Sequence, residues 1–156
     1  MKKHYLWILG IILVSAVILR VISWQTSKAE VIIGDKKISV EMRRTPLEWE
    51  KGLSGRKSLT DDTGMLFVFP DAAIRRFWMK EMRFPIDIFW IRDGRVVGMA
   101  KGLPPPPAYA KASAGRQNDI IPDATSPEPV NFVLETNAGF ADKYGITLGS
   151  PFALVP

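Results

Sequence analysis

Trp78, Met79 and Lys80 are the residues whose types best suit binding chemistry. The run 74–79 is predicted to be a strand, in which consecutive side chains point to opposite faces, so Trp78 and Met79 face apart. One of the two can then be a core residue while the other is exposed. An exposed aromatic ring beside a basic residue would suit stacking on sugars, bases or cations. The alternative is that Trp78 is simply a large core residue.

Arg56 and Asp87 are a second pair of candidate binding residues. Asp87 lies between Ile86 and Ile88 in a predicted strand, where a carboxylate needs a partner or access to solvent. If the side chain of Asp87 faces inward, Arg56 or another arginine is its natural partner. Such a pair could clamp a ligand or form a structural salt bridge, and both interpretations stay open.

Residues able to carry catalysis or hold a metal are scarce. The chain has no cysteine, and its one histidine is His4, so cysteine chemistry is excluded and the domain has no histidine base. Ser54 would have to use a lysine as its base. Asp61 and Asp62 lie in a predicted turn and fall short of the roughly six to eight oxygen ligands of calcium. We therefore expect no catalytic residue, no metal and no cofactor, with a carboxylate-based enzyme as an alternative.

The net positive charge belongs to the N-terminal segment. Of 21 basic and 16 acidic residues, four basic ones and no acidic one precede residue 30. The domain that follows is close to neutral, so the basic footprint of a nucleic-acid-binding protein is missing. Within it, Arg75, Arg76, Lys80 and Arg83 form a local basic cluster. This cluster could meet an anionic surface near the membrane or could be a solvated edge that discourages aggregation.

An apolar run near the N-terminus predicts a membrane span over residues 6–24. Lys2 and Lys3 precede it, which predicts an N-terminus on the inside. These 19 residues would form a helix roughly 29 Å long, which spans a bilayer. The uncharged stretch from Leu6 to Leu19 also fits a signal peptide cleaved near Ala29. Both interpretations place the domain outside the cytoplasm, tethered in the first and secreted in the second.

From residue 30 the sequence predicts short strands separated by turns. Gly34-Asp35 and Asp93-Gly94 indicate hairpin turns, and Thr45-Pro46-Leu47-Glu48 matches a capping box that opens a short helix ending at Gly52. Strands are expected at 31–33, 38–42, 65–69, 74–79, 86–91, 95–97, 130–136 and 152–155, the third of them stopped by a proline, with a second short helix at 140–144. The pattern predicts a mainly β domain over 30–156, a small sandwich or barrel with two short helices, preceded by the membrane segment and linker over 1–29.

Residues 101–129 interrupt this pattern. Four consecutive prolines at 104–107 are followed by a stretch rich in alanine and serine and poor in large apolar residues. A loop of this length in a small domain is either functional or disordered. We expect it to lack regular structure.

Several motifs between residues 44 and 139 carry a resemblance to a known family. They are Arg44-Thr45-Pro46, Gly52-Leu53, Arg56, Leu59, Gly64-Met65-Leu66-Phe67-Val68-Phe69, Phe77-Trp78-Met79-Lys80, Pro85-Ile86-Asp87-Ile88-Phe89, Asp93-Gly94-Arg95-Val96-Val97, Val133-Leu134-Glu135 and Ala138-Gly139. From about residue 30 to 155 the chain resembles the bacterial and archaeal family called domain of unknown function 192. The resemblance implies a compact jelly-roll or sandwich fold with short helices, in members that are often exported or membrane-tethered. It supplies no catalytic residue, because none is established for the family.

Together these observations predict a non-catalytic binding or accessory module of the cell envelope. Its candidate ligand-binding residues are Arg56, Trp78, Met79, Lys80 and Asp87. The alternatives are a carboxylate-based enzyme acting on envelope glycans and a structural or assembly partner of another membrane protein. A binding module needs a cleft with an exposed aromatic residue, whereas a scaffold shows a flat apolar patch.

Overall fold

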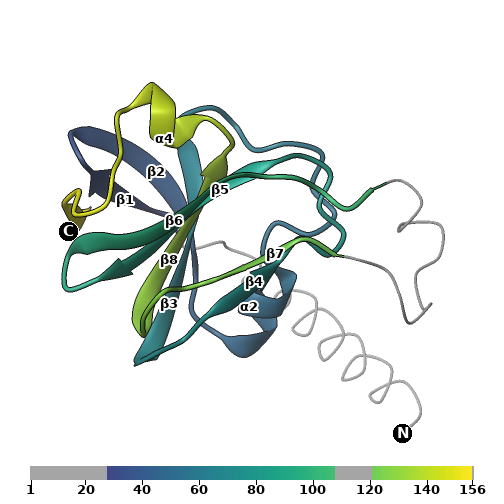
Figure 1. The fold of residues 1–156 in the computed structure, drawn as a ribbon, viewed down its shortest axis with the longest axis horizontal. Coiled ribbons are helices and arrows are strands. Elements are labelled where there is room, and N and C mark those ends of the chain that lie inside the picture. Colours follow the sequence, from purple (N-terminus) through teal and green to yellow (C-terminus); the bar gives the residue numbers. More distant parts are fainter. Residues whose placement is uncertain (1–27, 108–120, 156) are drawn as a thin grey trace, which may run out of the picture.

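A curled seven-stranded sheet dominates the computed structural model, which describes residues 28–107 and 121–155 (Figure 1). The strand order is β6-β5-β8-β3-β2-β1-β9, and the pair β2–β3 is parallel while the other neighbours are antiparallel. β4 and β7 form a separate two-stranded sheet. The elements are β1 (Lys28–Ile33), β2 (Lys36–Arg43), α2 (Pro46–Lys51), β3 (Thr63–Ala73), β4 (Arg76–Trp78), β5 (Ile86–Arg92), β6 (Arg95–Leu103), β7 (Asp123–Thr125), β8 (Val130–Asn137), α4 (Phe140–Lys143) and β9 (Phe152–Val155).

The sheet curls until the beginning of β6 meets the segment that leads into β9. The Val96 amide donates to the Ser150 carbonyl at 3.0 Å, and the Phe152 amide donates to the Gly94 carbonyl at 2.7 Å. A bridge between Arg95 and Pro151 lies between these bonds. The fold is therefore mainly β with two short helices, as predicted. Of the two predicted alternatives, a sandwich or a barrel, the single curled sheet does not fit a sandwich of two large facing sheets.

Apolar residues cover both faces of the central strands β3, β5 and β8, which gives the molecule two hydrophobic cores. The inner core fills the curl of the sheet; its members include Val31, Ile33, Val40, Leu66, Phe89, Ile91, Leu134, Phe140 and Phe152. The outer core lies on the opposite face of the same strands; its members include Leu53, Leu59, Met65, Phe67, Met79, Met82, Ile88, Trp90 and Val133. Figure 1 shows α4 at one end of the sheet, with α2 and the β4–β7 pair on another side. The helix α2, the two-stranded β4–β7 sheet and loops, in place of a second large sheet, thus cover the outer face.

The predicted turns and the first helix are confirmed. Gly34 joins β1 to β2 with a φ of 57°, and Asp93 and Gly94 join β5 to β6 with φ values of 50° and 70°. Positive φ at both central residues is the geometry of a type I′ hairpin. The capping box of Thr45 and Glu48 is present at the start of α2.

Three boundaries differ from the prediction. Pro70 does not stop β3, which continues to Ala73. The β3–β8 register shifts between Val68 and Ala73, and a proline is tolerated at such an irregularity because no ladder hydrogen bond is required of it. The strand expected at 74–79 is shorter, since β4 spans only Arg76–Trp78. In the region expected to lack regular structure, β6 reaches Leu103 and β7 forms at Asp123–Thr125, while 108–120 lie outside the described residues.

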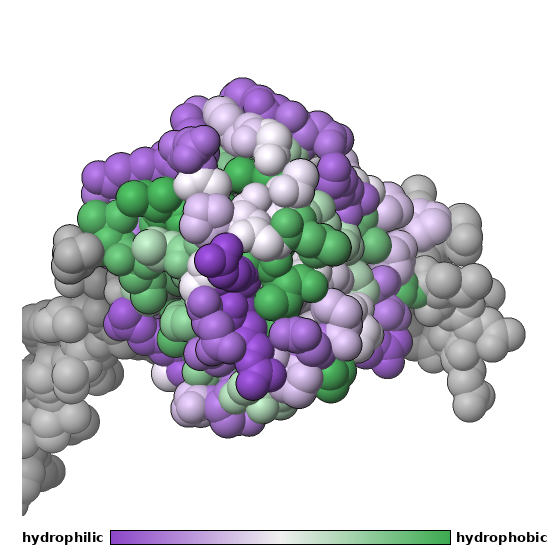
Figure 2. All heavy atoms as spheres, turned by 60° about the vertical axis from the view of Figure 1, so that its left-hand side comes forward, coloured by the Kyte–Doolittle hydropathy of each residue, from purple (hydrophilic) through white to green (hydrophobic). Residues whose placement is uncertain are grey.

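No helix within residues 28–107 and 121–155 has the length and hydropathy to cross a membrane. The predicted span at 6–24 lies outside the described residues. On the face seen in Figure 2, apolar side chains gather in separate groups that hydrophilic side chains divide.

Candidate functional site

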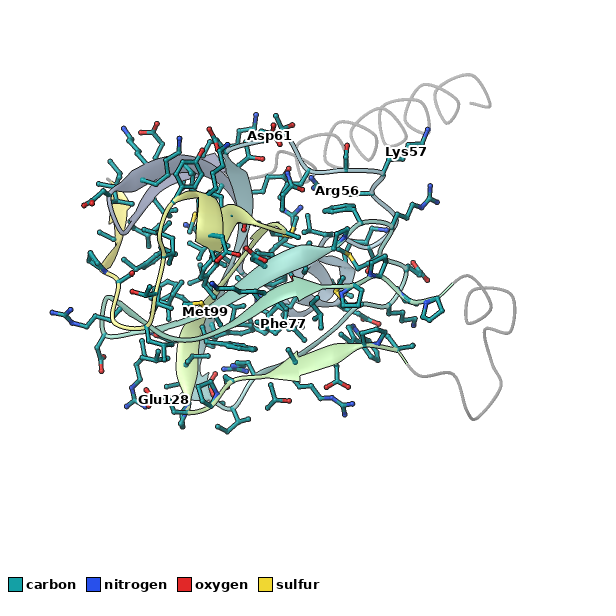
Figure 3. The ribbon with its side chains drawn as sticks, turned by 45° about the horizontal axis from the view of Figure 1, so that its top comes forward. Arg56, Lys57, Asp61, Phe77, Met99 and Glu128 are labelled. Atoms are coloured by element: carbon teal, nitrogen blue, oxygen red, sulfur yellow. The ribbon has the colours of Figure 1, made fainter. Side chains whose placement is uncertain are left out.

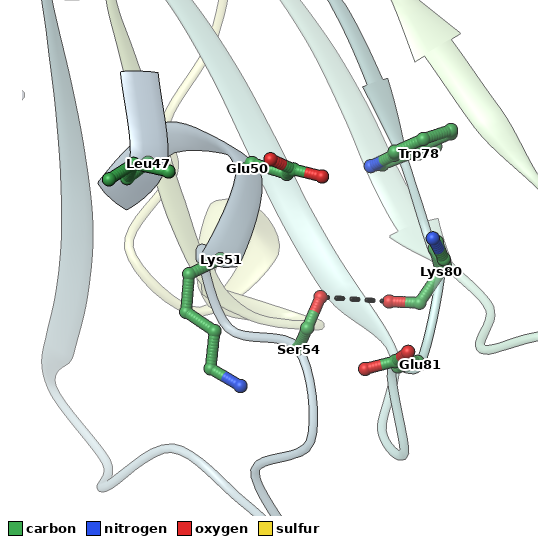
Figure 4. Close-up of a pocket in the computed structure, with 7 residues that line it drawn as sticks. All are labelled: Leu47, Glu50, Lys51, Ser54, Trp78, Lys80 and Glu81. Carbon is green, nitrogen blue, oxygen red and sulfur yellow. Dashed lines mark hydrogen bonds between the residues drawn. The ribbon is translucent and has the colours of Figure 1, made fainter. Parts of the chain in front are cut away.

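A groove of about 280 Å³ opens between α2 and the segment that follows β4 (Figure 4). It combines two apolar side chains with one hydroxyl and four charged groups. The lining residues are Leu47, Glu50, Lys51, Ser54, Trp78, Lys80 and Glu81. Two of the candidate binding residues of the sequence analysis, Trp78 and Lys80, therefore lie in one groove. The others, Arg56, Met79 and Asp87, do not line it.

The wall formed by α2 is fixed by its capping box and by Trp49. The Glu48 carboxylate accepts from the amides of Arg44 and Thr45 at 2.9 and 3.0 Å, which satisfies donors that a helix start leaves free. The Trp49 indole donates to the Arg43 carbonyl at 3.0 Å, and its ring lies 4.7 Å from that of Phe69. With Trp49 anchored to the outer core, Leu47 is left 81% exposed on the other side of the helix.

The opposite wall is set by strand alternation in β4. The Phe77 ring packs edge-on against Phe67 at 4.9 Å, so the next side chain, Trp78, points outward and is 53% exposed. Met79 turns back into the outer core and is 1% exposed, while its amide donates to the Pro122 carbonyl at 2.8 Å. The interpretation of Trp78 as a core residue is therefore wrong. Met79, a predicted ligand-binding candidate, is the core member of the pair.

Two hydrogen bonds join the walls of the groove at its base. The Ser54 hydroxyl donates to the Lys80 carbonyl at 2.9 Å, as drawn in Figure 4, and the Gly55 amide donates to the Glu81 carbonyl at 3.0 Å. Glu81 has a φ of 59°, an uncommon conformation for a residue with a side chain. The Lys80 ammonium lies 5.3 Å from the centroid of the Trp78 ring, within reach of a cation–π contact. The groove thus presents an aromatic ring and a cation side by side.

The charged groups of the groove have no ion-pair partner in the described part of the chain. Glu50, Lys51, Lys80 and Glu81 are all exposed, and none takes part in a salt bridge there. By contrast, two members of the basic cluster are paired: Arg75 with Asp71 at 3.0 Å and Arg76 with Asp123 at 2.6 Å. Two carboxylates and two ammonium groups therefore remain available to a ligand in the groove.

Arg56 is committed to Glu41 on β2, not to Asp87. Its two terminal nitrogens donate to the two carboxylate oxygens of Glu41 at 2.7 and 2.5 Å, and Arg43 adds a third donor at 2.9 Å. The hydrogen bond from Arg56 is the main cause that lowers the pKa of Glu41 below its ordinary value. Such a two-pronged pair fixes both planar groups, so Arg56 anchors the loop after α2 to the sheet. Figure 3 shows Arg56 and Lys57 on one rim of the molecule, away from Met99 and Glu128.

Asp87 has a structural role in the inner core. It is 1% exposed, and its two oxygens accept from the amides of Gly102 and Ala141 at 2.8 and 2.9 Å. Ala141 stands in the first turn of α4, where amides lack partners within the helix. Asp87 therefore ties the start of α4 and the end of β6 to β5. The partner that a buried carboxylate needs is here a pair of backbone amides, because these are the donors that the fold brings to it.

Asp62 belongs to a surface network of hydrogen bonds and ion pairs. Its carboxylate accepts from the Tyr144 hydroxyl and from the ammonium groups of Lys36 and Lys143, at 3.1 and 3.2 Å for the two lysines. The Tyr144 hydrogen bond, followed by those of the lysines, lowers the pKa of Asp62 to about 2. Within the described ranges no group of three or more His, Asp or Glu residues could hold a metal.

Glu135 is a titratable residue that the sequence analysis did not single out. It lies on the outer-core face of β8, between Met65 on β3 and Ile88 on β5, and is 6% exposed. Its Oε2 has no hydrogen-bond partner in the part of the chain that the structure describes, and burial raises its pKa to about 8. A carboxylate directly after Val133-Leu134 in an apolar strand is the signal that would have found it, by the reasoning applied to Asp87.

The chain belongs to the DUF192 family, whose model matches residues 29–154 and whose description reads "Uncharacterized ACR". Two solved structures resemble it, each with a TM-score of 0.69 and 27% sequence identity. One is a protein from Sinorhizobium meliloti 1021 described as a candidate transcription regulator; the match covers 83% of this chain and 95% of that one. The other is a protein of unknown function from Novosphingobium aromaticivorans DSM 12444, with 81% and 84% covered. The comparison with curated proteins found no match.

Proposed function

We propose that this protein is a non-catalytic binding module of the cell envelope, tethered by residues 6–24, that holds a glycan-containing ligand in the groove between α2 and β4. The observation that carries the proposal is the 53% exposure of Trp78 inside a groove whose charged groups have no ion-pair partner among residues 28–107 and 121–155. Exposing a ring of this size to water is unfavourable unless a ligand covers it. The flat apolar face of a sugar ring is a natural cover for an indole.

The polar lining of the groove supports a sugar more than a purely apolar ligand. Glu50 and Glu81 can accept hydrogen bonds from hydroxyl or amide groups, and Lys51 and Lys80 can donate them. The volume of about 280 Å³ is at the small end of ligand sites, which range from about 300 to 1,000 Å³. This size suits one or two rings of a longer chain that continues into solvent.

The location outside the cytoplasm rests on the N-terminal segment, with its two lysines followed by an apolar run. A role in transcription, the description given to the S. meliloti relative, would require a basic surface. Residues 30–156 contain 17 basic and 16 acidic residues. Two of the basic residues, Arg75 and Arg76, are already paired with carboxylates. The charge distribution therefore favours an envelope ligand over nucleic acid.

A glycan hydrolase is the second candidate, because Glu50 and Glu81 line the same groove. Glycoside hydrolysis uses two carboxyl groups, one of which stays protonated in an apolar environment. Both glutamates are exposed to solvent, which favours binding over hydrolysis.

The test is cosedimentation of the full-length chain, kept in solution by an amphipathic polymer, with insoluble peptidoglycan. Trp78→Ala should weaken binding about tenfold, or about 1.4 kcal/mol, with little change in thermal stability. Ile74→Ala is the matched control, since Ile74 is 54% exposed but does not line the groove. Soluble N-acetylglucosamine oligomers should compete with the polymer if the sugar is what is recognised.

Equal binding by the wild type and Trp78→Ala would refute the groove as the glycan site. Release of soluble reducing sugar from the polymer, abolished by Glu50→Gln or Glu81→Gln, would establish the hydrolase instead.

A further inference from the structure

A second groove, of about 650 Å³, follows the free edge of β6. Its lining residues, mostly apolar, come from β6, from the segment that contains β7 and from the turn after α4, with Trp90 contributed by β5; they include Val97, Met99, Pro127, Ile146 and Leu148. Leu148 is 65% exposed. Figure 3 labels Met99 on this part of the molecule, away from the rim that holds Arg56 and Lys57. The second groove shares no lining residue with the groove that contains Trp78, so the two are separate.

The backbone of β6 is paired on its outer edge only near its start. The Gly149 amide donates to the Val96 carbonyl at 2.8 Å, and the Val96 amide donates to Ser150 at 3.0 Å. Beyond that point, no backbone hydrogen bond joins residues 97–101 to any described segment other than β5. A row of unpaired amides and carbonyls on a strand edge is a template for another strand. Here the row lies along the second groove.

We propose that the second groove binds an extended segment of a partner protein, which adds a strand to the free edge of β6. The peptide backbone of such a segment would pair with the unpaired amides and carbonyls of residues 97–101. In an added strand successive side chains point to opposite faces of the sheet, so the segment should carry apolar residues at the alternate positions that lie on the same face as Met99.

The composition of the groove favours a peptide over other ligands. Lys101 is its one charged lining residue, and its ammonium already pairs with Asp142 at 2.6 Å. An anionic polymer would find no free cation among the lining residues. A purely apolar molecule would leave the β6 edge without partners.

The test is a selection of random peptides of about ten residues on phage against the full-length chain, kept in solution by an amphipathic polymer. Enriched peptides should alternate apolar and polar residues. A synthetic enriched peptide should bind Leu148→Asp at least tenfold more weakly than the wild type. Leu47→Asp is the matched control, since Leu47 is an exposed leucine that lines the first groove. On binding, hydrogen exchange should slow in the backbone amides of 97–101.

Four results would overturn the proposal. The first is the absence of an alternating pattern in the enriched peptides, and the second is equal loss of binding in Leu148→Asp and Leu47→Asp. The third is self-association of the full-length chain that Leu148→Asp abolishes, which would make a second copy of this chain the occupant. The fourth is laurate binding that Leu148→Asp weakens, without slower exchange at 97–101, which would make the groove a site for an apolar small molecule.

Discussion

The inner and outer cores share the strands β3, β5 and β8 but differ in whether their buried polar groups have hydrogen-bond partners. In the inner core, the Asp87 carboxylate accepts from two backbone amides. On the outer face, Glu135 Oε2 and the Trp90 indole are buried without partners in the described part of the chain. The first groove opens on the outer side, beside α2 and β4, whereas the second groove also reaches the inner core at Ile146. The inner core thus pairs its buried carboxylate, and the outer face retains unsatisfied buried groups, of which the Trp90 indole belongs to a residue that lines the second groove.

The largest expected effect is the pH dependence that Glu135 imposes on stability. Its pKa is raised from 4.5 to about 8 in the folded state, so the folded protein holds a proton that the unfolded chain has released. Stability should therefore fall as the pH rises from about 4.5 to 8, by up to about 1.4 kcal/mol per pH unit. Urea unfolding of the wild type and of Glu135→Gln at a series of pH values measures this. A slope that persists unchanged in Glu135→Gln would show that Glu135 is not its source.

A nearly equal effect should follow from the loss of Asp87, whose carboxylate accepts hydrogen bonds from two backbone amides. Asp87→Ala leaves the buried amide of Ala141 and the part-buried amide of Gly102 without an acceptor, which should cost about 3 kcal/mol in the free energy of unfolding. Tryptophan fluorescence during urea unfolding at pH 7 would measure the loss. Glu135→Met at the same pH should stabilise the protein, because it removes a buried carboxyl with an unpaired oxygen. If both substitutions destabilise equally, the contrast between the two cores fails.

A smaller effect is expected from breaking the ion pair between Arg56 and Glu41. Arg56→Gln removes the two-pronged contact to Glu41 and should cost about 1.5 kcal/mol at pH 7. Because Arg56 lowers the pKa of Glu41, this stabilisation is present above the unfolded value of 4.5 and is lost as the pH falls below it. Binding to peptidoglycan should not change, since Arg56 does not line the groove. A strong loss of binding with intact stability would assign Arg56 to the ligand after all.

The smallest effect should come from the exposed pair at the rim of the inner core. Lys101 and Asp142 lie 2.6 Å apart with side chains 45% and 75% exposed. Such surface pairs contribute about 0–1 kcal/mol, so Lys101→Ala should change the free energy of unfolding by less than about 0.5 kcal/mol. The same urea titration at low and at high salt checks this. A larger, salt-dependent loss would mean that the pair, together with Asp87, holds α4 in place.

Local signals in the sequence predicted the turns and the first helix well. Asp93-Gly94 and the capping box of Thr45 and Glu48 are short-range patterns whose geometry depends on neighbouring residues alone. The end of β3 was predicted less well, because Pro70 is accommodated by a register shift against β8, a strand some sixty residues later in the chain. Whether one sheet curls or two sheets face each other also depends on such distant pairings.

In the candidate site, too, local sequence patterns predicted some features and contacts between distant residues decided the others. Residue types pointed to Trp78 and Lys80, and strand alternation required Trp78 and Met79 to face apart, but it did not say which one is exposed. The contact of Phe77 with Phe67 decided that. Glu50, Lys51 and Glu81 carried no signal of their own, because a charged residue on a short helix or in a turn is ordinary. Packing of α2 against the outer core brought Glu50 and Lys51 beside Trp78, and the turn after β4 placed Glu81 there.

The sequence by itself therefore determined the β-rich class, the hairpin turns, the helix start and the resemblance to the DUF192 family. All of these follow from residue order over short spans or from motifs at fixed spacing. Only the tertiary structure decided that Arg56 pairs with Glu41, that Asp87 accepts from Gly102 and Ala141, and that β6 keeps a free edge along a groove. The reason is physical: a charged or polar group takes the partner that folding brings within hydrogen-bond distance, and sequence separation does not reveal that distance.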